Sequence, residues 1–187
     1  MGSNPTPRTS ILFVLALRLL DGIHPMGDWE LQLITKELNK EDIGRIREID
    51  RAEKVKLLYK CKDGSLIFEK VDLDVPRCSE QECAKRISTF SGELSKGGTL
   101  IGAIDGNLLV GAAILGHRLI GENLDEIQLV FLHVSNGYRR KGVATELFNV
   151  ICKLAKDEGA KKLYVSTTPS ESGVGFCLSH GCKLARK

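Results

Sequence analysis

The chain has 187 residues, of which 42% are hydrophobic and 27% charged, and its formal net charge is +3. This length and balance are typical of one soluble globular domain with its own core. The charge is too small for a nucleic-acid binder, and the only compact basic cluster is Arg139-Arg140-Lys141. The six cysteines form no Cys-x-x-Cys pair or zinc spacing. We therefore expect no bound metal, no disulfide framework and a reducing, cytoplasmic location.

The first 25 residues are expected to be an extension outside the domain, which we place at residues 26–187. Within this extension, residues 11–17 form an apolar run that is too short to span a membrane, so no stable membrane insertion is expected. The run has the length of a signal-peptide core, but Arg18 interrupts it and no small-residue cleavage site follows. Met1-Gly2 with Thr6 also fits the loose myristoylation pattern.

Hydrophobic periodicity and turn residues predict an α/β fold with a mixed, mostly antiparallel central sheet flanked by helices. The Asp63-Gly64 pair and residues 105–107 are hairpin signals, while residues 117–126 are polar and predict a loop. A strand–helix–strand crossover is expected in the last third of the chain. In chain order we expect a strand over 29–34, a helix over 41–49, strands over 56–61 and 65–71, a helix over 79–95, strands over 99–104, 108–115 and 127–134, a helix over 143–158, a strand over 162–167 and a helix from a capping box at 168–171 to 180.

A basic turn at residues 137–142 joins the apolar strand over 127–134 to the helix that begins at Val143. The first N–H groups of a helix have no partner within the helix, and its dipole adds positive charge, so such a turn binds anions. Gly137 and Gly142 have the spacing of a nucleotide-triphosphate loop, but Val143-Ala144 stand where that loop needs Lys and Ser or Thr. No early Gly-x-Gly-x-x-Gly supports a dinucleotide fold either.

The remaining pattern is Arg-x-x-Gly-x-Ala, formed by Arg139, Gly142 and Ala144. It resembles the Gln/Arg-x-x-Gly-x-Gly/Ala turn of the GNAT superfamily of acyl-coenzyme A N-acyltransferases. In that family the backbone amides of this turn hold the pyrophosphate of acetyl-coenzyme A. The physical chemistry agrees, because Gly142 lets the backbone approach the ligand closely.

Neighbouring residues extend the resemblance to roughly residues 29–182, most of the domain. Tyr138 precedes the turn as in the family, and Phe176 and Gly181 match the family's last helix. The resemblance implies acetyl-coenzyme A as the co-substrate, without a metal. It also implies ten cofactor-binding residues: Val134, Arg139, Arg140, Lys141, Gly142, Val143, Ala144, Thr145, Ser170 and Ser172.

The resemblance implies direct acyl transfer from the thioester to a deprotonated amine, which requires a proton acceptor. The family's usual glutamate on the fourth strand corresponds to Gln128, which cannot act as a base. Glu126 faces the same side of an extended strand and is the first candidate base, or else a solvated acid. His133 is the second candidate, or else a packed and hydrogen-bonded side chain. The family's usual tyrosine acid corresponds to Cys177, a poorer donor that otherwise packs in the core.

The sequence thus predicts an N-acetyltransferase that acts on a primary amine of a small molecule or peptide. The alternative is a coenzyme A-binding module with little or no catalytic activity, which Gln128 and Cys177 favour. The family's sheet normally has a strand after the one that begins near Cys182, so either a partner chain, as in a homodimer, completes the sheet, or the form is truncated. Glu122, Asp125 and Glu126 either attract a cationic amine or form a solvated loop.

Overall fold

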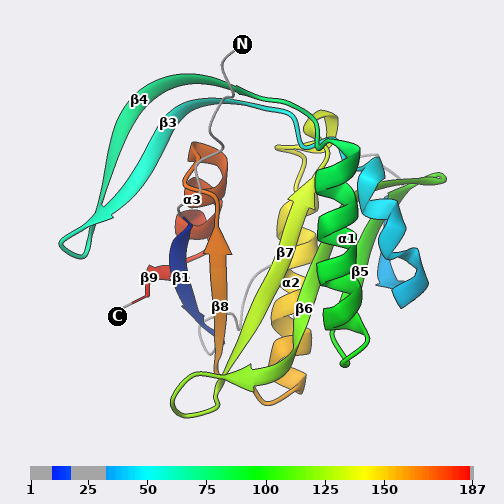
Figure 1. The fold of residues 1–187 in the computed structure, drawn as a ribbon. Helices are drawn as coiled ribbons and strands as arrows, with labels where there is room; N and C mark the ends of the chain where they lie inside the picture. Colours follow the sequence, from blue (N-terminus) through cyan, green and yellow to red (C-terminus); the bar gives the residue numbers. More distant parts are fainter. Residues whose placement is uncertain (1–9, 18–32, 186–187) are drawn as a thin grey trace.

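The structure of the protein is a computed structural model, which describes residues 10–17 and 33–185 (Figure 1). In this part of the chain, seven strands form one sheet in the order β2-β5-β6-β7-β8-β1-β9, and two more form a separate hairpin, β3-β4. The strands are β1 (Ile11–Ala16), β2 (Leu33–Leu38), β3 (Glu53–Lys62), β4 (Ser65–Val75), β5 (Thr99–Asp105), β6 (Leu108–Ile120), β7 (Glu126–Val134), β8 (Lys162–Thr167) and β9 (Lys183–Leu184). The α-helices are α1 (Glu80–Leu94), α2 (Val143–Asp157) and α3 (Glu171–Ser179), and the 3-10 helices are η2 (Lys40–Glu48) and η3 (Asn136–Tyr138).

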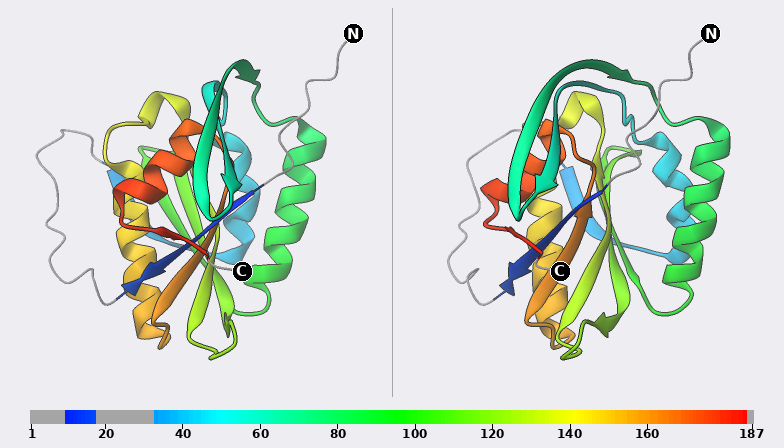
Figure 2. Two further views of the ribbon diagram at one scale, coloured as in Figure 1. Left: turned by 90° about the vertical axis from the view of Figure 1, so that its left-hand side faces the viewer. Right: turned by 60° about the vertical axis from the view of Figure 1, so that its left-hand side comes forward.

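Helices cover both faces of the large sheet, which confirms the predicted fold class (Figure 2). On one face, α2 and α3 pack against the sheet around Phe13 and Phe148, both of which are fully buried. On the other face, α1 and η2 pack around Phe90 and Phe131, whose ring centroids lie 5.0 Å apart. Only the β7–β8 pair is parallel; all other strand pairs in the described chain are antiparallel.

Most predicted elements form close to their expected positions, with two corrections. β6 continues to Ile120, so residues 117–120 belong to a strand and not to a loop. The last helix begins at Glu171, because the Ser170 hydroxyl, and not Thr168, accepts the hydrogen bond that caps it, from the Gly173 amide. Most of the strand expected over 29–34 lies outside the described residues.

The N-terminal segment joins the sheet, so the expected extension outside the domain is corrected for residues 11–16. β1 pairs antiparallel with β8 over its whole length, and Phe13 pairs with Leu184 of β9. Alternate residues of a strand face the same side of the sheet. Ile11, Phe13 and Leu15 are all buried, because their side faces the core beneath α2 and α3. The resemblance left two explanations for the missing last strand, namely a partner chain or a truncated form. In the structure, β1 pairs with the edge of β8. Residues 1–9 and 18–25 lie outside the described part of the chain.

The β3–β4 hairpin arches away from the sheet and comes down beside α3 (Figure 1). Its predicted Asp63-Gly64 turn is present, and both residues have positive φ angles (49° and 74°). The Tyr59 amide donates to the Pro169 carbonyl at 2.8 Å, which fixes the hairpin to the loop between β8 and α3. The hairpin therefore lies at the end of β8 that borders the candidate site.

Candidate functional site

The parallel strands β7 and β8 separate at the middle of the sheet. Their pairing runs from Glu126 opposite Lys162 to Leu129 opposite Val165 and then ends, although β7 continues to Val134. A register shift against β6 places Val130 as an extra residue at this point, and such bulges redirect a strand. Within the described chain, the facing backbone groups beyond this rung have no partner in a β7–β8 ladder. They are available to an extended ligand that carries amide groups.

The basic turn after β7 leads directly into α2. Arg140 (φ 63°) and Gly142 (φ 80°) both have left-handed backbones, and the glycine makes this conformation inexpensive just before the helix. Gly142 caps α2 without a side-chain hydrogen bond, so the first N–H groups of the helix keep no side-chain cap. The uncapped helix start and the adjacent cations make an anion site, as the sequence predicts.

Hydrogen bonds from distant strands fix the shape of this turn. The Ser135 amide donates to the Val110 carbonyl of β6 at 2.7 Å. The Tyr138 hydroxyl donates to Asp105 at 2.6 Å, and this hydrogen bond raises the pKa of Tyr138. Because β5 and β6 hold the turn at both points, its amides are preorganised for a ligand.

A cavity of about 350 Å³ lies between this turn and α3. Arg139 and Arg140 line it from the turn, and Ser172 and Phe176 line it from α3. Glu53 and Glu171 also line it, so the cavity carries both signs of charge. Three of the predicted cofactor-binding side chains therefore meet here: Arg139, Arg140 and Ser172.

Other predicted cofactor-binding side chains have different contacts. The Lys141 ammonium lies over the Tyr138 ring, 5.3 Å from its centroid. Ser170 is buried as the cap of α3, and the Thr145 hydroxyl lies 3.2 Å from His180 Nε2. The side chains of Val134 and Val143 are buried, so these residues offer only their backbone to a ligand.

The structure does not bring Glu126 to the gap between β7 and β8. Glu126 lies at the closed end, where its Oε1 is 3.0 Å from Lys162 Nζ. A strand rises about 3.3 Å per residue, so this position is roughly 13 Å along β7 from the bulge at Val130. Gln128 is closer, since it lies opposite Tyr164 one rung before the pairing ends.

Cys177 does not point into the cavity beside the turn. Its side chain is 3% exposed and packs in the core beneath α3. The Cys182 thiol next to it, together with burial, raises the pKa of Cys177 well above its usual range. A thiol in this place has the packing role that the sequence left open.

A histidine–carboxylate pair lies beside Gln128, on the face of the sheet that α1 covers. His117 Nδ1 lies 2.5 Å from Glu93 Oε1, which also accepts the His117 amide at 2.9 Å. Burial opposes ionisation of Glu93, but these hydrogen bonds lower its pKa below the usual value. A methyl group on Gly116 would lie 3.2 Å from the Gln128 carbonyl and 3.4 Å from Glu93 Oε1, so the pair borders Gln128. Sequence patterns missed this pair because its residues are 24 positions apart.

His133 is half-buried and already hydrogen-bonded. Its Nε2 lies 3.0 Å from Arg51 Nη2, and Phe131 packs against its ring. Burial, together with the charges of Arg51, Arg86 and Arg139, lowers the pKa of His133 well below its usual value. The ring is neutral near pH 7 and accepts the guanidinium hydrogen bond. This agrees with the second role considered for His133 from the sequence, that of a packed and hydrogen-bonded side chain.

The sequence profile of the acetyltransferase (GNAT) family matches residues 63–178. The chain belongs to this family. A search of curated proteins found no significant match.

Solved acetyltransferases share this fold. A nourseothricin acetyltransferase superposes with a TM-score of 0.62 at 13% identity, covering 80% of this chain and 82% of the other. A putative streptothricin acetyltransferase from Bacillus anthracis, solved with acetyl coenzyme A, gives 0.54 at 17% identity, covering 81% and 82%. The enzyme AAC(6')-Iy, in complex with a bisubstrate analogue of coenzyme A, gives 0.55 at 13% identity, covering 83% and 94%.

Proposed function

We propose that the protein is a cytoplasmic N-acetyltransferase that moves an acetyl group from acetyl-coenzyme A to a primary amine of a small molecule or peptide. One observation carries the proposal: the gap between β7 and β8 opens beside the uncapped start of α2. A pantetheine arm has amide groups for the free strand edges, and a diphosphate suits the helix start. The six cysteines are free, which is consistent with a reducing compartment.

The cofactor stretch divides into backbone and side-chain contributions. We assign the diphosphate to the backbone N–H groups of residues 142–145 and the pantetheine to the backbone near Val134. Arg139 and Arg140, which line the cavity beside α3, add positive charge. Ser172 contributes a hydroxyl to the same cavity. Acetyl-coenzyme A supplies the activated carbonyl carbon that the amine attacks.

We infer that His117 takes the proton from the attacking amine through water, since Gln128 has no basic group. Glu93 holds the ring through Nδ1, which leaves the other ring nitrogen to accept a proton. The amine nitrogen forms the new bond to the carbonyl carbon, and the carbon–sulfur bond breaks as the thiolate leaves. The thiolate then takes a proton from solvent, because Cys177 is buried away from the cavity.

The names of similar structures support a small-molecule acceptor. One is a nourseothricin acetyltransferase, another is described as a putative streptothricin acetyltransferase, and a third is bound to a bisubstrate analogue that contains acetylneamine. Their identities to this chain are 13–17%, so the likeness itself shows the fold, and the particular acceptor must be found by experiment.

The second candidate function is a coenzyme A-binding module without activity, which the replacement of the usual base by Gln128 favours. Two measurements distinguish the enzyme from this module. Calorimetric titration with acetyl-coenzyme A should show binding, and titration with ATP and magnesium should not. Thiol release on a panel of amines should then show turnover. Binding without release on any amine would favour the binding module, and binding of ATP alone would exclude both functions.

A further inference from the structure

The charges of three arginines act on His133, and one of them contacts its ring. We call Arg51, Arg86 and Arg139 the arginine cluster. Arg51 hydrogen-bonds the His133 ring, and all three guanidinium groups lie close enough to disfavour a positive charge on that ring. Because His133 is the last residue but one of β7, Arg51, which contacts it, borders the gap at its open end.

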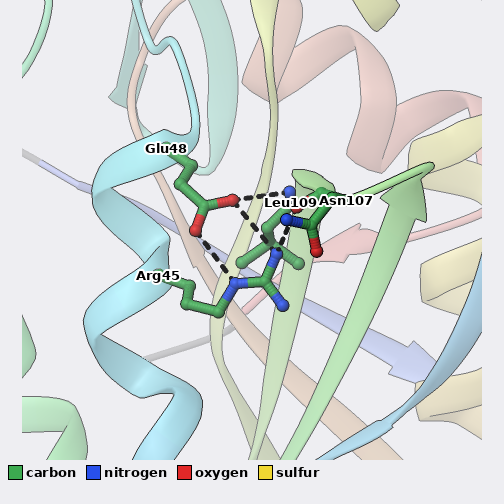
Figure 3. Close-up of polar contacts among 4 residues, drawn as sticks. All are labelled: Arg45, Glu48, Asn107 and Leu109. Carbon is green, nitrogen blue, oxygen red and sulfur yellow. Dashed lines mark hydrogen bonds and ion pairs between the residues drawn. The ribbon is translucent and has the colours of Figure 1, made fainter.

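The structure holds Arg51 in this place through η2. Arg45 and Glu48 of η2 form a two-pronged ion pair (2.9 and 3.2 Å), and Glu48 also accepts the Leu109 amide at 2.7 Å (Figure 3). Arg45 in turn donates to the Asn107 carbonyl at 3.0 Å (Figure 3). These bonds fix η2 to the β5–β6 hairpin, and the residues that follow η2 are therefore fixed as well.

The loop between η2 and β3 is then fastened to the cofactor turn. The Asp50 amide donates to the Ser135 hydroxyl at 3.0 Å, and the Asn136 amide donates to the Asp50 carbonyl at 2.9 Å. Arg51 follows directly, so its position is coupled to the turn that begins at Ser135. A side chain positioned this firmly is suited to recognise a ligand beside the cofactor.

The three arginines of the cluster lack a paired carboxylate within the described residues. Arg51 Nε is buried and has no hydrogen-bond partner in the described chain. No ion pair within the described residues involves Arg51, Arg86 or Arg139. Glu82 is close enough to feel Arg51 and Arg86, but its carboxylate is bonded to the Ser79 amide (3.1 Å) and hydroxyl (3.0 Å). An unpaired, partly buried guanidinium is costly to keep, which points to an anionic ligand.

A second cavity, whose lining includes two cysteines that act on Arg51, offers room for the rest of a ligand. It has a volume of about 720 Å³ and lies between the end of η2 and the start of α1. Arg47, Arg77 and Glu80 line it, together with Cys78 and Cys83, whose thiols lie near Arg51. Arg77 is paired with Asp50 (3.4 Å), and Glu80 offsets the charge of Arg47, so the cavity offers room for a ligand without adding net positive charge.

We propose that the acceptor amine carries a carboxylate or phosphate group, and that Arg51 and Arg86 bind this group. The planar donor fork of arginine matches both oxyanions. The same charges would repel a polycationic amine, so the cluster also excludes one class of acceptor. This inference rests on the proposed acetyl transfer and names its substrate class.

Matched acceptors on the full chain test the proposal. Thiol release is measured at saturating acetyl-coenzyme A with phenylalanine against phenethylamine, and with phosphoethanolamine against ethanolamine. We expect kcat/KM to be at least about tenfold higher for the anionic member of one pair. Arg51→Met should remove that advantage by raising KM for the anionic amine, while the Kd of acetyl-coenzyme A stays unchanged. The exposed Arg118 provides the matched control, Arg118→Met, which should behave as the wild type.

The following results decide whether the anion site exists. Equal kcat/KM within both pairs would overturn the proposal, and so would a tenfold weaker Kd for acetyl-coenzyme A in Arg51→Met, because the arginine would then serve the cofactor. If Arg51→Met does not fold, Arg86→Met replaces it. If no amine is acetylated, the proposed function fails by itself. In that case, calorimetry can measure the binding of N-acetylphenylalanine in the presence of coenzyme A. Binding to the wild type that is lost in Arg51→Met would still support the anion site, and no binding to the wild type would overturn the proposed anion site.

Discussion

Phe13→Ala measures how strongly the N-terminal strand is built into the domain. The Phe13 side chain is 0% exposed and lies in the core that β1 shares with α2, α3 and β8. Removal of a buried phenylalanine costs about 3–5 kcal/mol, which is a large part of a typical stability of about 5–15 kcal/mol. A domain of this size loses about 2–4 °C of midpoint per kcal/mol, so the melting temperature should fall by about 6–20 °C.

Urea unfolding followed by circular dichroism provides the assay, with Phe68→Ala as the matched control. Phe68 lies on the hairpin and is 59% exposed, so its loss should cost less than about 1 kcal/mol. The difference between two phenylalanine truncations removes the effects of composition on the unfolded chain. If both variants lost the same small free energy, β1 would be a weakly attached strand, and the reasoning from its pairing with β8 would be refuted.

Three further predictions concern residues around the site. Glu126→Gln breaks a partly buried ion pair with Lys162 and should cost about 1 kcal/mol in urea unfolding. Because Glu126 lies at the closed end of the β7–β8 pair, thiol release should stay unchanged, and a large loss of turnover would restore Glu126 as the base. Folding lowers the pKa of His133, so the unfolded chain takes up a proton near pH 6.5 that the folded chain does not. The free energy of unfolding should therefore fall by up to about 1.4 kcal/mol per pH unit below pH 6.5, and a His133→Gln variant that kept this slope would assign it elsewhere. Gly173→Ala should destabilise by about 1–3 kcal/mol, because its methyl group would come within 2.9 Å of a backbone carbonyl at the end of β8. Gly175→Ala meets no atom within 4 Å and should be neutral or stabilising, so equal losses in the two glycine variants would contradict the packing of α3.

Features with a local signal could be predicted from the sequence. The Asp63-Gly64 hairpin, the strand over 162–167 and the uncapped helix start at Gly142 each depend on neighbouring residues. The turn could be distinguished from a nucleotide loop because the two residues after Gly142 are apolar.

Features that depend on distant pairing could not be predicted. The run over 11–17 carries no mark of its partner, since β8 lies about 150 residues further along the chain. Glu126 shares a strand face with Gln128, but only the pairing of β7 with β8 shows that it lies at the closed end. Arg51 lies in a loop with no periodicity, and its contact with His133 spans 82 residues. Tertiary contacts decide each of these three cases.

The most direct test concerns acetyl-coenzyme A at the start of α2. Calorimetric titration should show that the wild type binds acetyl-coenzyme A, and that Gly142→Glu weakens binding at least about tenfold, because a carboxylate would meet the diphosphate. Gly142→Asn is the matched control, since asparagine tolerates the left-handed backbone (φ 80°) without adding charge, and it should bind more tightly than Gly142→Glu. Undiminished affinity in Gly142→Glu would contradict the assignment of the turn to the diphosphate.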